Sequence, residues 1–333
     1  MKLTFASLGI LLFAFVSIVT CSKQPEALNA PTAGAAKSLK FALIVKTQQN
    51  PVFICMQRGA EEEAKKLSVE VQTFSPAVEK NFQEQVELVR SAARKKFDAI
   101  LIAPSDSKLL VAPLKEAADA GVPIINIDNA LDPAELKRQN LTLDAFIGVD
   151  NVAGGRLGAQ YLAQKIGGAG EVMMLEGFVG VANAEDRKRG FHEEIAKHPN
   201  IKLVASQTAN WYTEEALTVT TGLLPKYPNL KGIFCANDLM ALGAIRAVEQ
   251  AGKTNSVVIV AFDNIKEVRE SLLNGKLAGS IEQWPDWMGA EAVRAAHELK
   301  TKGKLTNRDR RSPIEMISKE SLTTKPVEAV GVR

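Results

Sequence analysis

Short apolar runs recur along the chain and alternate with stretches in which apolar residues return at helical spacing. Unbroken apolar runs are typical of strands that are covered on both faces. The helical pattern is clear in "VEKNFQEQVELVRSAARKK" (78–96) and "TEEALTVTTGLLPKY" (213–227). This alternation predicts right-handed βαβ units and therefore an α/β fold with parallel sheets. The predicted strands are 41–45, 69–74, 99–103, 123–127, 145–149, 171–175, 201–205, 232–236, 257–261 and 279–283.

The chain length bears on how these strands are grouped. They could form one wide sheet or two sheets of about five strands. About 290 residues follow the N-terminal segment described next, which is more than one hydrophobic core usually holds. The length therefore predicts two domains.

The first residues have the pattern of a secretion signal. Lys2 is followed by an apolar run from Leu8 to Val19, which is too short to span a bilayer as a stable helix. "IVTC", ending at Cys21, resembles the lipobox of bacterial lipoproteins, in which the cysteine carries the lipid. We expect a signal peptide over 1–20, lipidation of Cys21 and a flexible tether over 21–38. A plain exported protein in which Cys21 is incidental is the alternative.

Composition excludes several classes of function. The formal net charge is +3, or +2 without Lys2, and no basic block calls for nucleic acid. The three histidines lack zinc-site spacing, and no second apolar run could span a membrane. Cys55 and Cys235 could form a disulfide in an exported protein, although two buried free thiols are favoured.

Polar and aromatic residues follow most of the predicted strands. In parallel sheets the ligand crevice lies beyond the carboxyl ends of the strands. Helix capping explains part of this pattern, because Asn, Asp and Ser satisfy free backbone N–H groups and Asn50-Pro51 suits a helix start. Capping does not explain Phe53, Trp211 and Phe262 at the same ends. Carboxylates, carboxamides and flat rings together suit a polyhydroxylated, largely uncharged small molecule.

Motifs for other chemistry are missing from the sequence. There is no phosphate loop of the GxxxxGK[ST] type, no dinucleotide fingerprint after a strand and no GxSxG elbow. Two carboxylates could in principle hydrolyse a glycoside, yet Asp128 and Asp263 are better explained as acceptors for hydroxyl groups. We therefore predict no catalytic residues, no cofactor and no metal.

Several segments together resemble the periplasmic sugar-binding proteins of the ribose-binding type. They include "TQQNPVF", "PIINIDNA", "GVDNVAGGRLGAQYL", "FCANDLMALGAIRAV", "VIVAFDN" and "IEQWPDWMG". The resemblance runs in order from about residue 39 to 322. It implies a type I periplasmic-binding-protein fold of two Rossmann-like lobes, joined by three crossovers, and an ATP-driven (ABC) importer whose permease accepts the cargo.

The resemblance also implies lobe boundaries. The N-terminal lobe would comprise 39–147 and 284–312, and the C-terminal lobe 148–283 and 313–322, with a tail over 323–333. The crossovers are expected near Asp144–Asp150, Gln283–Pro285 and Ser312–Ile314. Ligand would favour the closed arrangement of the lobes, because contacts from both lobes are satisfied together only there.

The resemblance implies a set of ligand-binding residues. Phe53 and Phe262 could equally be core, and Asn50 and Asn237 could serve as caps as well as ligands. Val52 stands where the family has a second Phe, and Asn129 where ribose binders often have Arg. The implied set is Asn50, Phe53, Asp128, Asn129, Glu185, Trp211, Asn237, Phe262, Asp263 and Gln283.

The segment "NAEDRKRGF" leaves one assignment open. Counted back from Gly190-Phe191, Arg187 takes the place of a structural arginine and Glu185 that of a ligand-binding one. Glu185 could instead only pair with Arg187 or Lys188. If it does bind ligand, three carboxylates would converge with few cations, Lys46 being the nearest. Such a site disfavours acidic ligands.

The expected function is therefore capture of a neutral monosaccharide or polyol, or conceivably an amino sugar, for an ABC importer. We expect a monomer, in the periplasm or on the cell surface, held to the membrane through Cys21. A sensor that presents the sugar to a chemoreceptor or kinase is the alternative. A LacI-type regulator domain shares the fold, but the secretion leader stands where its DNA-binding helices would be.

Overall fold

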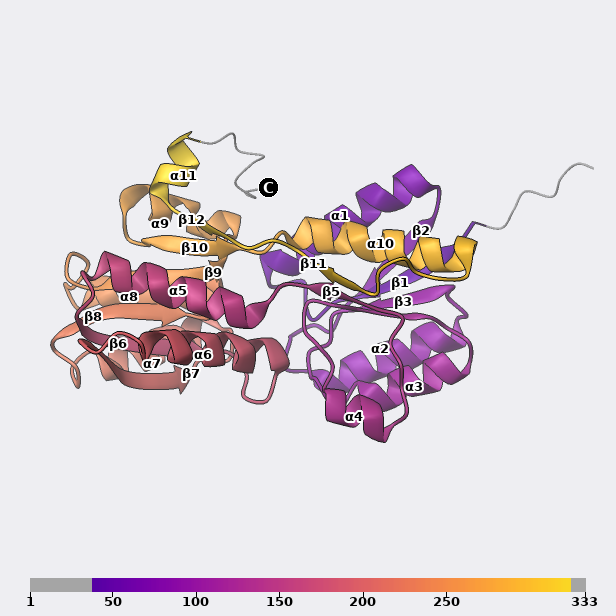
Figure 1. The fold of residues 1–333 in the computed structure, drawn as a ribbon, viewed down its shortest axis with the longest axis horizontal. Coiled ribbons are helices and arrows are strands. Elements are labelled where there is room, and N and C mark those ends of the chain that lie inside the picture. Colours follow the sequence, from indigo (N-terminus) through magenta and orange to yellow (C-terminus); the bar gives the residue numbers. More distant parts are fainter. Residues whose placement is uncertain (1–37, 325–333) are drawn as a thin grey trace, which may run out of the picture. The chain divides into compact units, whose positions relative to one another are not determined.

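The computed structural model describes residues 38–324, which form two α/β lobes, each built on a six-stranded sheet. Figure 1 shows the two lobes, with the strands of each sheet flanked by helices. The predicted signal peptide, Cys21, the rest of the predicted tether as far as residue 37, and residues 325–333 lie outside the described residues.

The first lobe has an entirely parallel sheet in the order β11-β5-β4-β3-β1-β2. Alternate residues of its strands pack on opposite faces: Leu43 and Leu101 belong to one apolar cluster, and Ile44 and Ile102 to the other. The strands are β1 (Lys40–Ile44), β2 (Glu70–Phe74), β3 (Ala99–Ile102), β4 (Ile124–Ile127), β5 (Ala145–Gly148) and β11 (Asp309–Arg311). The helices are α1 (Pro51–Leu67), α2 (Phe82–Arg94), α3 (Val111–Asp119), α4 (Pro133–Arg138) and α10 (Pro285–Lys302).

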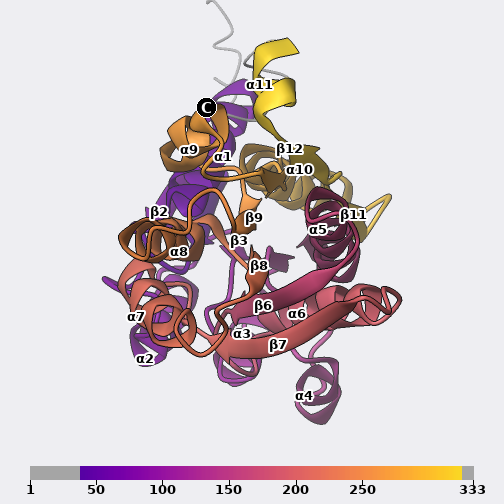
Figure 2. The same ribbon diagram turned by 90° about the vertical axis from the view of Figure 1, so that its left-hand side faces the viewer.

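The second lobe has the sheet order β12-β10-β9-β8-β6-β7, in which only β12 runs antiparallel to its neighbour. Figure 2 shows α5 and α6 to one side of its central strands and α7 and α8 to the other. The strands are β6 (Gly170–Glu176), β7 (Ile201–Thr208), β8 (Leu230–Cys235), β9 (Val258–Asp263), β10 (Gly279–Glu282) and β12 (Glu315–Ile317). The helices are α5 (Asn151–Lys165), α6 (Ala182–Ile195), α7 (Thr213–Leu223), α8 (Asp238–Gln250), η1 (Lys266–Val268), α9 (Arg269–Asn274) and α11 (Lys319–Thr324).

The chain passes between the sheets three times within the described residues. It leaves β5 for α5, returns from β10 to α10, and leaves β11 for β12. The connecting stretches are short, comprising 149–150, 283–284 and 312–314. Trp284 has a left-handed backbone (φ 56°) immediately before Pro285, and this turns the chain from β10 into α10.

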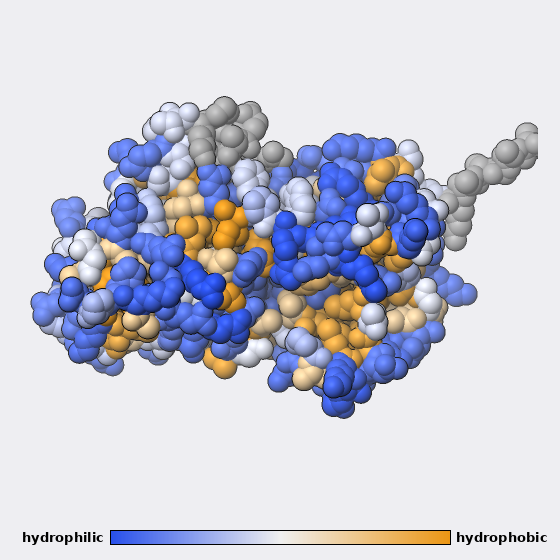
Figure 3. Space-filling view, viewed as in Figure 1, coloured by the Kyte–Doolittle hydropathy of each residue, from blue (hydrophilic) through white to orange (hydrophobic). Residues whose placement is uncertain are grey.

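The predicted α/β fold with two parallel-stranded sheets is confirmed, and each predicted strand is present within a few residues. Strands β11 and β12 were not predicted, because each is only three residues long and "DRR" has no apolar pattern. On the face shown in Figure 3, hydrophilic residues cover most of both lobes and hydrophobic residues show as patches between them. Cys55 and Cys235 are free thiols.

The helix that follows β1 explains the unusual joint "TQQNPVF". The Asn50 side chain accepts a hydrogen bond from the Val52 N–H (3.0 Å), and Pro51 occupies the first helical turn, where a missing N–H costs nothing. Val52 and Phe53 are buried. The cap therefore sets α1 directly beyond the carboxyl end of β1.

Helices α1 and α10 cross in backbone contact at two glycines. A Cβ on Gly59 would lie 2.0 Å from the Asp286 carbonyl oxygen, and one on Gly289 would lie 1.9 Å from the Met56 carbonyl oxygen. Both contacts are with backbone atoms, so the crossing tolerates no side chain at either position. This close packing holds α10, which follows the second crossover, against α1, which borders the cleft.

Gly289→Ala is expected to lower the free energy of unfolding by about 2 kcal/mol, since over-packing forces the two helices apart. Gly222→Ala is the matched control: it lies in α7, and nothing is within 4 Å of its added Cβ. Alanine is the better helix former, so this control should gain roughly 0.5–1 kcal/mol. Urea unfolding of both variants measures the difference, and shifts of the same sign would contradict the crossing.

Candidate functional site

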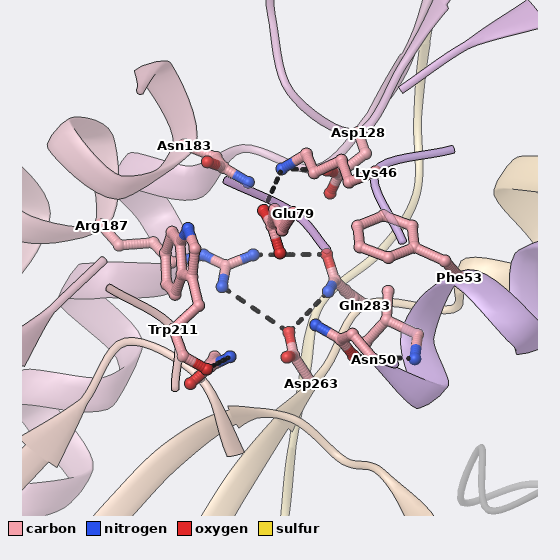
Figure 4. Close-up of a pocket in the computed structure, with 12 residues that line it drawn as sticks. Lys46, Asn50, Phe53, Glu79, Asp128, Asn183, Arg187, Trp211, Asp263 and Gln283 are labelled. Carbon is pink, nitrogen blue, oxygen red and sulfur yellow. Dashed lines mark hydrogen bonds and ion pairs between the residues drawn. The ribbon is translucent and has the colours of Figure 1, made fainter. Parts of the chain in front are cut away.

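A cavity of about 280 Å³ lies between the carboxyl ends of the two sheets. Both lobes and the second crossover contribute its walls, and Figure 4 shows the side chains converging on it. The lining residues are Lys46, Asn50, Val52, Phe53, Glu79, Asp128, Asn183, Arg187, Trp211, Asn237, Asp263 and Gln283.

The wall from the first lobe is built around a buried lysine. Lys46 follows β1, and its Nζ lies 3.0 Å from Asp128 Oδ2 and 3.8 Å from Glu79 Oε1. It also stands 5.6 Å from the centroid of the Phe53 ring. Burial raises the pKa of Glu79, with the Lys46 charge opposing that shift. A cation, two carboxyl groups and an aromatic face therefore meet on this side.

The wall from the second lobe is built around a buried arginine of α6. The Arg187 guanidinium lies 3.5 Å from the centroid of the Phe262 ring and 5.7 Å from that of Trp211. Its Nε donates to Asn151 Oδ1 (2.9 Å) and its Nη1 to the Ala236 carbonyl (2.7 Å). Burial lowers the pKa of Arg187, but a guanidinium starts so high that it stays charged.

Asp263 joins this arginine to the crossover. Its Oδ1 lies 3.6 Å from Arg187 Nη1 and accepts a hydrogen bond from Gln283 Nε2 (2.7 Å). Gln283 Oε1 in turn accepts from Arg187 Nη2 (3.4 Å). Burial raises the pKa of Asp263 to about 7, although the Arg187 charge pulls it down. The three side chains form one closed network.

The backbone at the cavity is strained where side chains are directed inward. Asp128 (φ 62°), Trp211 (φ 67°) and Asp263 (φ 117°) all lie in the left-handed region, which side-chain-bearing residues rarely adopt. Trp211 also needs a glycine beside it, because a Cβ on Gly177 would lie 2.0 Å from its ring. Strain of this kind persists only where the surrounding structure enforces it.

Three buried polar side-chain atoms of the lining have no hydrogen-bond partner among the described residues, namely Asp128 Oδ2, Asn183 Oδ1 and Trp211 Nε1. Asp128 Oδ2 has the Lys46 ion pair instead, whereas the other two have no such compensation. Leaving such groups unsatisfied costs roughly 1–3 kcal/mol each. An acceptor and a donor are thus available to a polar guest.

The structure brings together most of the residues predicted from the sequence. Asn237 lines the cavity and also caps α8, accepting from the Met240 N–H (2.9 Å), so both expected roles are compatible. The predicted residues that line the cavity are Asn50, Phe53, Asp128, Trp211, Asn237, Asp263 and Gln283. Phe262, fully buried, lies behind the Arg187 guanidinium instead.

Glu185 lies outside the cavity, so the third carboxyl group of the lining is that of Glu79 and not that of Glu185. Its carboxylate accepts a hydrogen bond from the Gly180 N–H (2.8 Å). The physical reason is helical spacing: Asn183 and Arg187 lie four residues apart on α6 and share the inward face, whereas position 185 is turned away. The site therefore holds three carboxyl groups and two cations, Lys46 and Arg187, which is one cation more than expected.

Asn129 is also outside the cavity. It is fully buried in the first lobe, and its Nδ2 donates to the Pro104 carbonyl (3.0 Å) and to Ser107 Oγ (3.2 Å). Its Oδ1 accepts from the backbone N–H of Asn183 in the other lobe (3.0 Å). Both polar atoms of this side chain are therefore engaged within the protein, away from the cavity lining.

Sequence reasoning missed Glu79 and Asn183, and it noted Lys46 only as a nearby cation. Glu79 lies between β2 and α2, and its place after a strand was an available signal. Asn183 could have been found from the i, i+4 spacing to Arg187. Among residues 38–324, no group of His, Cys, Asp or Glu could hold a metal ion. No helix in the same range is long and apolar enough to cross a membrane.

Comparisons with known proteins all find one family. The sequence pattern of the periplasmic binding protein domain matches residues 41–305. The D-allose-binding periplasmic protein of Escherichia coli is 36% identical over 287 residues, which are 86% of this chain and 92% of that protein. The D-ribose/D-allose-binding protein of Pseudomonas aeruginosa is 32% identical over 86% of this chain and 90% of its own length.

A solved structure shows the same similarity in three dimensions. It is an ABC transporter periplasmic solute-binding protein from Actinobacillus succinogenes with bound D-allose. The match has a TM-score of 0.83 at 38% sequence identity and covers 86% of this chain and all of that one.

Arg187→Met is expected to lower the free energy of unfolding at pH 7 by about 3 kcal/mol, since Asp263 then lacks its buried counter-charge. Adding Asp263→Asn removes the orphaned charge and should restore at least ~1 kcal/mol. Urea unfolding of the single and double variants measures this coupling. A double variant no more stable than Arg187→Met would contradict the pairing.

Proposed function

The chain belongs to the periplasmic binding protein family, and we propose that it captures a neutral monosaccharide between its lobes for an ABC importer. The family consists of solute-binding components of transport rather than enzymes, and this protein is not an enzyme. The relatives named above are a D-allose-binding and a D-ribose/D-allose-binding protein. D-allose and D-ribose are therefore the first sugars to test.

One observation carries this proposal: each lobe neutralises its own buried cation. Lys46 is paired with Asp128 in the first lobe, and Arg187 with Asp263 in the second. No cation is left for a phosphate or a carboxylate, whose burial would need one. Hydrogen-bonding groups and ring faces remain, and a neutral sugar uses both.

The lining of the cavity agrees with a single sugar ring. Phe53 and Trp211 come from opposite lobes and present aromatic faces, which can cover the C–H faces of a pyranose. We propose Asn50, Phe53, Asp128, Trp211, Asn237, Asp263 and Gln283 as ligand contacts, joined by Lys46, Glu79, Asn183 and Arg187.

The same arrangement accounts for release. Because the lining comes from two lobes, a sugar makes its full set of contacts only when they are closed, so it stabilises that state. The torsions of the connecting stretches 149–150, 283–284 and 312–314 would absorb the opening motion. The permease of the importer would then receive the sugar from a monomer.

The proposed site is tested by calorimetry and a thermal-shift panel of neutral pentoses, hexoses and polyols, with sugar phosphates and uronic acids for comparison. We expect micromolar or tighter binding of at least one neutral sugar and none of the acidic ligands. Asp263→Ala should weaken binding at least about tenfold, since charge-assisted hydrogen bonds are lost. Asp119→Ala, at the exposed end of α3, is the control. Binding of acidic ligands alone would contradict the proposal.

Membrane attachment is a second element of the proposal. The lipobox-like "IVTC" and the small, polar stretch after it support a lipid on Cys21 and a location outside the cytoplasm. A single chain anchors only weakly, whereas the several acyl chains of a lipoprotein anchor stably.

Cys21→Ser is expected to move the protein from the membrane to the soluble fraction when cells are fractionated, because the lipid has no attachment point. Cys55→Ser serves as the control, since that thiol lies in α1 and should leave membrane association unchanged. Intact-mass analysis of the N-terminus identifies the lipid. Equal solubility of wild type and Cys21→Ser would rule out the anchor.

A further inference from the structure

The first turn of α6 lacks a cap of its own. Its N-cap residue is Val181, which has no side-chain acceptor and makes no capping bond. The first N–H groups of a helix have no partner within the helix and need one from elsewhere. Here the partners come from the other lobe. Ser107 Oγ accepts from the Ala182 N–H (3.0 Å), and Asn129 Oδ1 accepts from the Asn183 N–H (3.0 Å).

Ser107 and Asn129, here called the α6 seat, are held in place by the first lobe alone. Asn129 Nδ2 donates to the Pro104 carbonyl and to Ser107 Oγ, and the Asn129 carbonyl accepts from Asn126 Nδ2 (2.9 Å). Because a carbonyl can only accept, the amide nitrogen must face Pro104 and the amide oxygen must face α6. None of these bonds requires the second lobe, so the α6 seat is already formed when the lobes are apart.

The α6 seat does not line the sugar cavity itself, although Asn129 directly follows the lining residue Asp128. Neither of its residues lines the cavity, whereas Asn183 and Arg187 both do. Asn183 and Arg187 lie on the same helix. Docking of the first turn of α6 on the first lobe therefore fixes their positions relative to Lys46 and Asp128. Phe82 and Phe178 make a separate edge-to-face contact between the lobes (centroids 5.9 Å apart), so closure does not depend on the α6 seat alone.

We propose that Ser107 and Asn129 are positioning residues that cap α6 only in the closed protein and thereby slow the release of sugar. The inference rests on the proposed function, because it concerns the same cleft. Two capping bonds form when the lobes close and break when they open. Breaking them adds to the barrier for opening and so lowers the dissociation rate constant of the sugar. The association rate constant is not affected, because the sugar first meets the open cleft, where these bonds are absent.

Ala182→Pro removes one of these bonds without touching the sugar or the fold of α6. Proline is favoured at the first helical position, and Val181 already has the extended backbone (φ −85°, ψ 125°) that a following proline requires. The variant loses the N–H that Ser107 accepts. Ala182→Ser retains that N–H and is the matched control.

Stopped-flow tryptophan fluorescence with the sugar that the wild type binds gives both rate constants. For Ala182→Pro we expect about tenfold weaker binding, carried by faster dissociation, because affinity changes within one interface appear mostly there. The association rate constant of Ala182→Pro should stay within about twofold of the wild-type value. All the constants of Ala182→Ser should also stay within about twofold of wild type. The unfolding temperature of the sugar-free variant should be unchanged or higher.

Ser107→Ala and Asn129→Ala provide an independent check. Ser107→Ala removes the acceptor of the Ala182 N–H and Asn129→Ala that of the Asn183 N–H, so each should speed the dissociation of the sugar. If both Ala182→Pro and Asn129→Ala release sugar at the wild-type rate, the proposed role of the α6 seat is wrong, while the proposed function is unaffected. A lower unfolding temperature together with slower association in these variants would also contradict that role, because it would show that the lobes themselves are damaged. A wild-type protein that binds no sugar would overturn the proposed function itself.

Discussion

Every charge that enters the cleft is buried, and a buried charge is tolerated only with a partner. Lys46 and Arg187 are each about 2% exposed, and each finds its carboxylate within its own lobe. Each cation is therefore paired on its own side of the cleft, so neither lobe supplies the counter-charge of the other. Hydrogen-bonding groups and aromatic surface remain to contact a ligand, and these suit the polar molecule without net charge that we propose.

The fold was largely predictable because it depends on patterns that are local in sequence. Unbroken runs such as "AILI" and "PIINI" are apolar on both faces, and the helices between them repeat at 3.6 residues, so doubly covered parallel sheets follow. The exceptions are informative. β11 and β12 are edge strands of three residues, and "DRR" pairs with β5 only because the chain crosses between the lobes there. Nothing local marks such a strand.

The lining residues were predicted best at the ends of strands and least well on α6. Asp128, Trp211 and Asp263 stand at strand ends and line the cavity. The choice between Glu185 and Arg187 stayed open, because counting along the sequence does not show which face of α6 turns inward; Arg187 is the one that lines the cavity. Asn129 has the chemistry of a ligand contact, but its bonds to Pro104 and Ser107 are set by tertiary packing that no local pattern records.

The central claim is that one neutral sugar occupies the cavity between two walls whose cations are each paired within their own lobe. A crystal structure of the protein with the tightest-binding sugar tests it most directly. The account predicts a single ring between Phe53 and Trp211, with hydroxyl groups bonded to Asp128 and Asp263 and both ion pairs retained. A sugar bound elsewhere, or a guest in the cavity whose own charge replaces one of the carboxylates beside Lys46 or Arg187, would contradict it.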